Sequence, residues 1–258
     1  MTPDIDQPLQ CHQHTRTMSG IAGQEGDRHF MTRLLAIFPA AGKGLRMGIL
    51  SRPKVLLPVA GVPMILRTLT AFSDAAAITE AVIASPAETI DEINKVINSF
   101  NSFPVRFVTG ADERWQSVRN AFETLDASPE DLVLIHDADR PLVGADIIRR
   151  VCEKAANSGA AICAVLVTDT LKEATNDRRI IQTHQRERFF LAQTPQVFRY
   201  DMLKKAYSAT GTEAASDEAS IVERAGFAVH IVDGSSRNIK VTYQDDLILA
   251  ERLIAESR

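Results

Sequence analysis

The sequence predicts an α/β fold: a Rossmann-like, mostly parallel sheet with helices on both faces and a projecting β-arm. Short apolar runs of strand type alternate with longer segments of helical periodicity from Leu34 onward. The first apolar run ends abruptly at Pro39 in a loop of small residues, as strand-to-helix connections in such sheets often do. The 258 residues are 45% hydrophobic and 24% charged, which is ordinary for a globular chain with a large core.

The first part of the chain is expected to alternate strand and helix. The expected strands are residues 34–38, 81–84, 105–108, 132–136 and 161–165. The expected helices are residues 64–72, 89–98, 115–125 and 145–157. Helices that connect successive strands make those strands parallel, and ligands collect at the carboxyl ends of parallel strands. The loops after Phe38 and His136 fall at that edge.

After Val167 the pattern changes. Residues 169–193 are charged and weakly periodic, and strands at 179–183 and 189–193 are expected to form an arm that stands off the main sheet. Helical periodicity returns at 202–208, 216–225 and 244–257, with a short strand at 228–232. We therefore expect residues 33–258 to form a single domain.

The amino-terminal segment and the composition limit the class of protein. Residues 1–32 are polar and lack periodicity, which predicts a disordered extension, with Met18 or Met31 as alternative starts. The net charge of −4 argues against a nucleic-acid binder. No apolar run approaches the roughly 20 residues that cross a bilayer, and the first thirty residues lack an apolar signal core. We therefore expect a cytoplasmic protein without a membrane or nucleic-acid partner.

The loop after the first strand is the strongest functional signal. Its small residues let the backbone approach a ligand closely. They are Pro39, Ala40, Ala41, Gly42 and Gly44. Lys43, Arg46 and Lys54 add positive charge, so the segment predicts a cradle for a nucleotide triphosphate. It is neither a P-loop nor a dinucleotide fingerprint, and an ordinary connection with solvated basic residues is the alternative.

Charged side chains close the fourth expected strand. Asp137, Asp139 and Arg140 follow its apolar residues. Asp137 emerges where it can hold a metal or a substrate hydroxyl, and the guanidinium of Arg140 is a planar fork suited to phosphate. A strand-end salt bridge between the two is the alternative. Function is favoured because two phosphate-type loops then converge on one edge of the sheet.

Two further segments place polar residues at the same edge. Asp112, which precedes a helix, is either a helix cap or part of a surface that reads a base edge, and Ser117 points the same way. Trp115 is expected to be a packing residue. Lys240 lies in an otherwise apolar strand of residues 238–242, where it must reach either solvent or an anion.

These segments, in this order, resemble the 2-C-methyl-D-erythritol 4-phosphate cytidylyltransferase family. They are residues 39–47, 53–54, 110–118, 136–141, 169–170, 194–198, 216–219 and 238–242. The resemblance spans roughly Leu34 to Glu256. It implies transfer of CMP from CTP to methylerythritol 4-phosphate in isoprenoid precursor synthesis, with release of pyrophosphate. In such a transfer, positioning and electrostatics supply most of the catalysis.

The resemblance also implies roles for individual residues. The implied catalytic residues are Arg46, Lys54 and Lys240, which would neutralise the reacting phosphates. The implied nucleotide-binding residues are Pro39, Ala40, Ala41, Gly42, Gly44, Gly110, Asp112 and Ser117. The implied residues for the polyol phosphate are Asp137, Arg140, Thr170, Arg186, Thr194 and Ser216. Mg²⁺ would bridge the phosphates, with Asp137 as a candidate metal ligand.

A homodimer is implied as well. The arm of residues 169–193 matches the projecting arm with which members of this family clasp a second subunit. Arg186 would then reach the active site of the neighbouring subunit.

A few positions depart from the family pattern. Asp139 stands where the family usually has alanine, Thr168 replaces a common arginine, and residues 55–64 also resemble sugar-1-phosphate nucleotidyltransferases. Three alternatives therefore stay open: a ribitol 5-phosphate cytidylyltransferase, a sugar-1-phosphate nucleotidyltransferase, and a non-catalytic nucleotide-binding regulator on the same fold.

Overall fold

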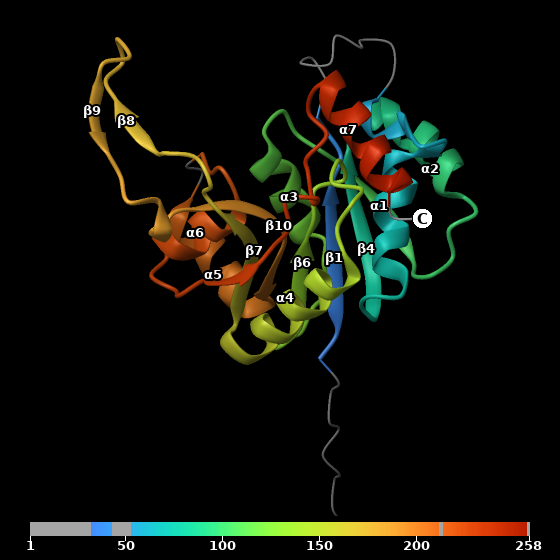
Figure 1. The fold of residues 1–258 in the computed structure, drawn as a ribbon. Coiled ribbons are helices and arrows are strands. Elements are labelled where there is room, and N and C mark those ends of the chain that lie inside the picture. Colours follow the sequence, from blue (N-terminus) through green and yellow to red (C-terminus); the bar gives the residue numbers. More distant parts are fainter. Residues whose placement is uncertain (1–31, 43–52, 212–213, 257–258) are drawn as a thin grey trace, which may run out of the picture. The chain divides into compact units, whose positions relative to one another are not determined.

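The computed structural model describes residues 32–42, 53–211 and 214–256. Within them, a seven-stranded sheet forms the centre of an α/β fold (Figure 1). Its strands are, in spatial order, β11 (His230–Asp233), β7 (Ala160–Leu166), β10 (Phe190–Arg199), β6 (Leu132–Ile135), β1 (Leu34–Pro39), β4 (Ile78–Ser85) and β5 (Val105–Thr109). Within this sheet β10 is antiparallel to both of its neighbours and all other pairs are parallel. The expected mostly parallel sheet is confirmed.

Helices pack on both faces of this sheet, as expected. They are α1 (Met64–Ser73), α2 (Ile90–Ile97), α3 (Arg114–Phe122), α4 (Ala145–Ser158), α5 (Tyr200–Thr210) and α6 (Glu218–Arg224), whereas α7 (Gln244–Ala255) packs in a separate cluster. Side chains alternate along a strand, so Leu34, Ala36 and Phe38 of β1 join the core formed with α1, α2 and α4. Leu35 and Ile37 face the second core, formed with α3, α5 and α6. A strand buried on both faces must be apolar throughout, which explains the continuous apolar run.

A third, smaller cluster joins the C-terminal helix α7 and the loop before it to residues 59–64. Val241 and Ala250, the latter on α7, pack with Val59 and Met64. Val59 ends β2 (Pro58–Val59), which pairs with β3 (Val62–Pro63) just after the 3₁₀ helix η2 (Lys54–Leu56). Lys54 and Val241, which are 187 residues apart in sequence, are thereby held within hydrogen-bond distance.

The arm is shorter than the sequence suggested, and one of its expected strands belongs elsewhere. A hairpin of β8 (Lys172–Ala174) and β9 (Ile180–Thr183) stands off the sheet beside β7 and β10 (Figure 1). The strand expected at 189–193 is instead the start of β10, which pairs with β6 and β7 in the main sheet. Phe190, Leu191 and Ala192 are exposed, but they pair with β7, and this pairing places the segment in the sheet. The arm is therefore residues 168–188.

The strand expected at 238–242 is not regular structure. This segment is a connection between β11 and α7, and its backbone bonds to loops: the Val241 N–H donates to the Asp139 carbonyl at 2.9 Å. The apolar residues Ile239 and Val241 pack on the third cluster, which explains the strand-like pattern without a strand. The remaining expected strands and helices of residues 32–256 are present, with ends shifted by a few residues. In the described part of the chain, no helix is long and apolar enough to span a membrane.

Candidate active site

The two loops expected to bind a nucleotide lie against each other. The Ala40 N–H donates to the Ala84 carbonyl at 2.7 Å, and the Gly110 N–H donates to the Ser85 carbonyl at 2.8 Å. A Cβ atom added to Gly110 would lie 2.7 Å from the Cβ of Ala41. Glycine is therefore required at 110 because the loops approach too closely for a side chain. Pro39, Ala40, Ala41, Gly42 and Gly110 form one surface, whereas Gly44 and Arg46 lie outside the described residues.

The side chain of Ser117 stabilises the loop that carries Gly110. Its side chain is fully buried. Its Oγ accepts the Ala111 N–H at 2.9 Å and lies 3.1 Å from the Ala111 carbonyl and 3.2 Å from the Glu113 carbonyl. The hydroxyl thus fixes the loop that precedes α3, while Asp112 stands exposed on it. Trp115 is buried, as expected for a packing residue.

Asp137 is the centre of a buried cluster of charges at the carboxyl end of β6. It is 5% exposed. Its carboxylate accepts from Arg114 Nε at 2.7 Å, from Lys240 Nζ at 3.0 Å and from Arg140 Nε at 3.4 Å. Burial alone would raise the pKa of Asp137, but the charges of these three cations outweigh it and hold the pKa well below its usual range. Asp137 is therefore ionised, and both of its oxygens are engaged.

Arg114 and Glu218 are functional candidates that the sequence reasoning missed. Arg114 Nη1 donates to the fully buried carboxylate of Glu218 at 2.7 Å, so one guanidinium joins Glu218 to Asp137. Burial raises the pKa of Glu218. Burial alone would lower the pKa of Arg114, but the carboxylates of Glu218 and Asp137 raise it. A charged side chain in the first turn of a largely buried helix was the available signal, and both residues stood inside the motifs that carried the family resemblance.

Lys54 and Lys240 converge on a second carboxylate, that of Asp139. Lys54 and Asp139 are each 9% exposed, and Lys54 Nζ forms an ion pair with Asp139 Oδ2. The same ammonium donates to the Val241 carbonyl at 3.0 Å. Lys240 Nζ lies 3.9 Å from Asp139 Oδ1. Two of the three predicted catalytic cations are therefore adjacent.

Thr194 and His136 form a buried support behind Asp137. His136 Nε2 lies 3.1 Å from the Arg140 carbonyl, which can only accept, so Nε2 carries the proton. Nδ1 then accepts from the Thr194 hydroxyl at 3.1 Å, and that hydroxyl accepts the Asp137 N–H at 3.0 Å. Burial lowers the pKa of His136 to about 4, so the ring is neutral near pH 7. The Thr194 hydroxyl, predicted to bind substrate, is engaged within the chain.

Of the remaining predicted substrate residues, only Arg140 is near the cluster, and the others are exposed. Arg140 joins the cluster and also donates from Nη1 to the Asn238 carbonyl at 2.8 Å. Thr170 and Ser216 are exposed. Arg186 is exposed on η4 (Arg186–Arg188) of the arm, where its guanidinium bonds the Thr168 carbonyl. Asp137, Arg140 and Thr194 are thus brought together, whereas Thr170 and Arg186 belong to the segment that stands off the sheet.

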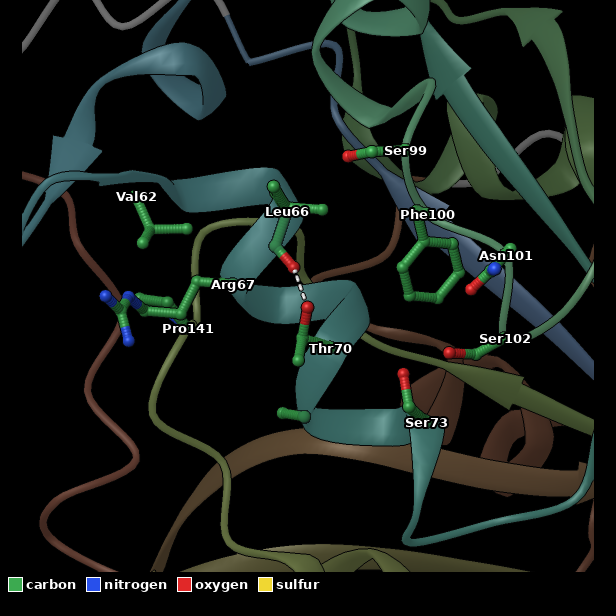
Figure 2. A pocket seen from close by; sticks show the side chains of 11 residues that line it. Val62, Leu66, Arg67, Thr70, Ser73, Ser99, Phe100, Asn101, Ser102 and Pro141 are labelled. Atoms are coloured by element: carbon green, nitrogen blue, oxygen red, sulfur yellow. Dashed lines mark hydrogen bonds between the residues drawn. The ribbon is translucent and has the colours of Figure 1, made fainter.

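A separate pocket of about 590 Å³ lies between α1 and the loop at residues 99–102 (Figure 2). Its lining includes Leu66, Thr70 and Phe100, and the Thr70 hydroxyl donates to the Leu66 carbonyl at 2.8 Å. Arg67, at one end, donates to the Val59 carbonyl. None of the residues predicted for catalysis or binding lines this pocket, so it is not the candidate active site.

The sequence profile of the family described as 2-C-methyl-D-erythritol 4-phosphate cytidylyltransferase matches residues 34–256. The chain belongs to this family. It is 39% identical over 228 residues to the 2-C-methyl-D-erythritol 4-phosphate cytidylyltransferase of Acidobacterium capsulatum, covering 84% of this chain and 95% of that protein.

Solved structures agree with the assignment. The cytidylyltransferase of Francisella tularensis superimposes with a TM-score of 0.71 at 32% identity, over 86% of this chain and 99% of that chain. That of Thermus thermophilus has a TM-score of 0.67 at 33% identity, over 86% of this chain and 98% of that chain. In this member of the family, the matched segment contains all of the charged cluster around Asp137 and Asp139.

Proposed function

We propose that this protein transfers CMP from CTP to the 4-phosphate of 2-C-methyl-D-erythritol, in the synthesis of isoprenoid precursors. Family membership across residues 34–256 supports the reaction. The observation in the structure that carries it is the convergence of Lys54, Lys240 and Arg140 at one sheet edge, beside two loops that approach each other at Ala41 and Gly110. Cations beside an open, small-residue surface are what a triphosphate and a second phosphate require.

The reaction needs alignment and charge neutralisation and no covalent enzyme intermediate. An oxygen of the methylerythritol phosphate attacks the α-phosphorus of CTP, and the bond from that phosphorus to the bridging oxygen of the β-phosphate breaks. Pyrophosphate leaves with that electron pair. Two anions must approach each other, so fixed cations around the α-phosphorus lower the barrier more than any proton transfer does.

The described residues divide this work between them. The surface of Ala40, Ala41 and Gly110 would take the cytosine and ribose, since a side chain at residue 110 would collide with Ala41. Lys54 and Lys240 would neutralise the α-phosphate as negative charge grows on it, together with Arg46, which lies outside the described residues. Lys54 Nζ has three hydrogens and donates to two acceptors within the described ranges, which leaves a donor for the phosphate.

The polyol phosphate would lie at Asp137 and Arg140, and a second subunit would complete its site. The arm carries exposed apolar side chains at Ile180 and Ile181, and Leu191 of β10 beside it is exposed as well. Apolar surface of this kind, on a projecting hairpin, is typical of a protein interface. A homodimer in which the arm of one copy supplies Thr170 and Arg186 to the site of the other accounts for the exposure of both residues.

Magnesium would enter with the nucleotide, as the magnesium complex of CTP. In the described ranges, no cluster of three or more His, Cys, Asp or Glu residues could hold a metal ion. Asp137, the candidate ligand, already accepts from three cations, and a metal would have to displace them. Phosphate oxygens and water are sufficient ligands for Mg²⁺. The cytoplasmic location stays a prediction.

Pyrophosphate release by the purified protein tests the proposed function. With CTP and Mg²⁺, turnover is expected with methylerythritol 4-phosphate, and ribitol 5-phosphate and a hexose 1-phosphate serve as rival acceptors. Turnover only with a rival acceptor would keep the mechanism and replace the substrate. Silence with every acceptor, together with measurable CTP binding, would instead favour a nucleotide-binding regulator.

A further inference from the structure

Asp139 lies between the two lysines that face the reacting phosphate. Its Oδ2 forms the ion pair with Lys54, while its Oδ1 lies 3.9 Å from Lys240 Nζ. Oδ1 is buried and has no hydrogen-bond partner among the described residues. Lys240 also binds Asp137 at 3.0 Å. The side chains therefore form a row of alternating charge: Lys54, Asp139, Lys240, Asp137.

A carboxylate in this place opposes the binding of an anion. A triphosphate is attracted by net positive charge, and Asp139 removes one unit from the pair of lysines. Burying the carboxylate is also costly, since within the described part of the chain its Oδ1 loses water and gains no hydrogen bond. Neither effect strengthens the binding of the nucleotide before the reaction.

What Asp139 contributes is a fixed geometry of the two lysine side chains. Asp139 holds Lys54 through its side chain, and its carbonyl accepts the N–H of Val241, the residue after Lys240. Lys54 in turn donates to the Val241 carbonyl at 3.0 Å. The ammonium of Lys54 thus has two fixed acceptors and a defined direction for its remaining hydrogen. Without Asp139, two neighbouring ammonium groups would repel each other and spread apart.

We propose that Asp139 is a positioning residue for cytidylyl transfer: it sets the direction of Lys54 and the spacing between Lys54 and Lys240, and it weakens nucleotide binding in return. The inference rests on the proposed function. Fixed donors stabilise charge that develops in the transition state without reorganising, whereas loose cations attract the ground state equally well. Asp139 therefore favours turnover over affinity.

The substitution Asp139→Asn separates these two effects. It keeps the shape and removes the charge, so kcat is expected to fall about tenfold or more while the KM for magnesium CTP falls about threefold. Calorimetric binding of magnesium CTP, without acceptor, should show the same tightening. Asp139→Ala should behave likewise, and Asp139→Glu should recover part of kcat. Asp74→Asn, at an exposed carboxylate next to α1, is the matched control and should change neither constant.

Three results would overturn the proposal. One is a kcat and a KM within twofold of the wild type. Another is a raised KM with a raised Mg²⁺ requirement, which would make Asp139 a metal ligand. The third is a kcat loss matched by a loss of folded protein in thermal unfolding. If the proposed function is wrong, the wild-type protein itself will show no turnover. The binding of magnesium CTP to Asp139→Asn still tests the inference in that case.

Discussion

The cluster around Asp137 and the arm of residues 168–188 are both rich in charged side chains, yet they lie in opposite surroundings. In the cluster, Lys54 and Asp137 are at most 9% exposed and every carboxylate faces a cation. In the arm, charged residues are exposed together with the apolar Ile180 and Ile181, which are 59% and 57% exposed. The ion pairs of the cluster form within one chain. The arm leaves apolar surface in water, and a second copy of the chain would cover it.

The largest effect should come from the cluster. Lys54→Ala removes a buried cation from the reacting phosphate, and kcat/KM is expected to fall about 1000-fold. Steady-state pyrophosphate release measures it, and Lys154→Ala, at an exposed lysine of α4, is the control. The mass of the assembly should not change. A loss smaller than tenfold would remove Lys54 from the catalytic residues.

A substitution in the arm is expected to weaken assembly first. Ile181→Asp places a charge on the surface expected to meet the second copy, and dimer dissociation should become at least about 100-fold easier. Ile248→Asp on α7 is the matched control, because Ile248 is 60% exposed and far from the arm in sequence. Sedimentation over a range of concentrations measures both. Equal behaviour of the two variants would count against the arm as the interface.

Mixing two inactive variants joins the two regions in one experiment. If Lys54 acts within its own chain and Arg186 in the neighbour, then Arg186→Ala and Lys54→Ala subunits form one intact site per mixed dimer. Random exchange at equal amounts should then restore about a quarter of the wild-type activity. No recovery after complete exchange would show that Arg186 does not serve the neighbouring site.

The smallest effect concerns the support behind the cluster. The pKa of His136 is lowered to about 4 by burial, against about 6.5 when unfolded, so only the unfolded chain takes up a proton between these values. Stability is therefore complete above pH 6.5 and falls as the pH drops toward 4. Between pH 7.5 and 5 the wild type should lose about 2 kcal/mol more than His136→Gln, measured by urea unfolding. If the free energy of unfolding changed equally with pH in both proteins, the lowered pKa of His136 would be contradicted.

The same contrast explains how far sequence reasoning reached. Continuous apolar runs such as residues 34–38 identified the central strands, because burial on both faces leaves no other pattern. Ala41 and Gly110 were grouped as nucleotide-binding residues only through the family resemblance, and the structure places them close together. Lys54 and Lys240 came together as expected, although the segment that carries Lys240 is a loop.

What could not be predicted depends on tertiary context. The chain from the arm into β10 has no break in its pattern near Phe190, so the boundary between them is set by pairing with β7. Arg114 and Glu218 resembled ordinary surface residues of helix ends. Only the fold shows that Arg114 bonds directly to both Glu218 and Asp137.

The base of the arm is closed by a backbone bond from the Val167 N–H to the Phe189 carbonyl at 3.0 Å. Leu166 at the end of β7 and Phe190 at the start of β10 are already paired in the sheet. The arm is therefore a connection between two antiparallel strands, β7 and β10, whose ends are held together at its base. Insertions or deletions in the arm are therefore expected to alter its reach without disturbing the register between β7 and β10.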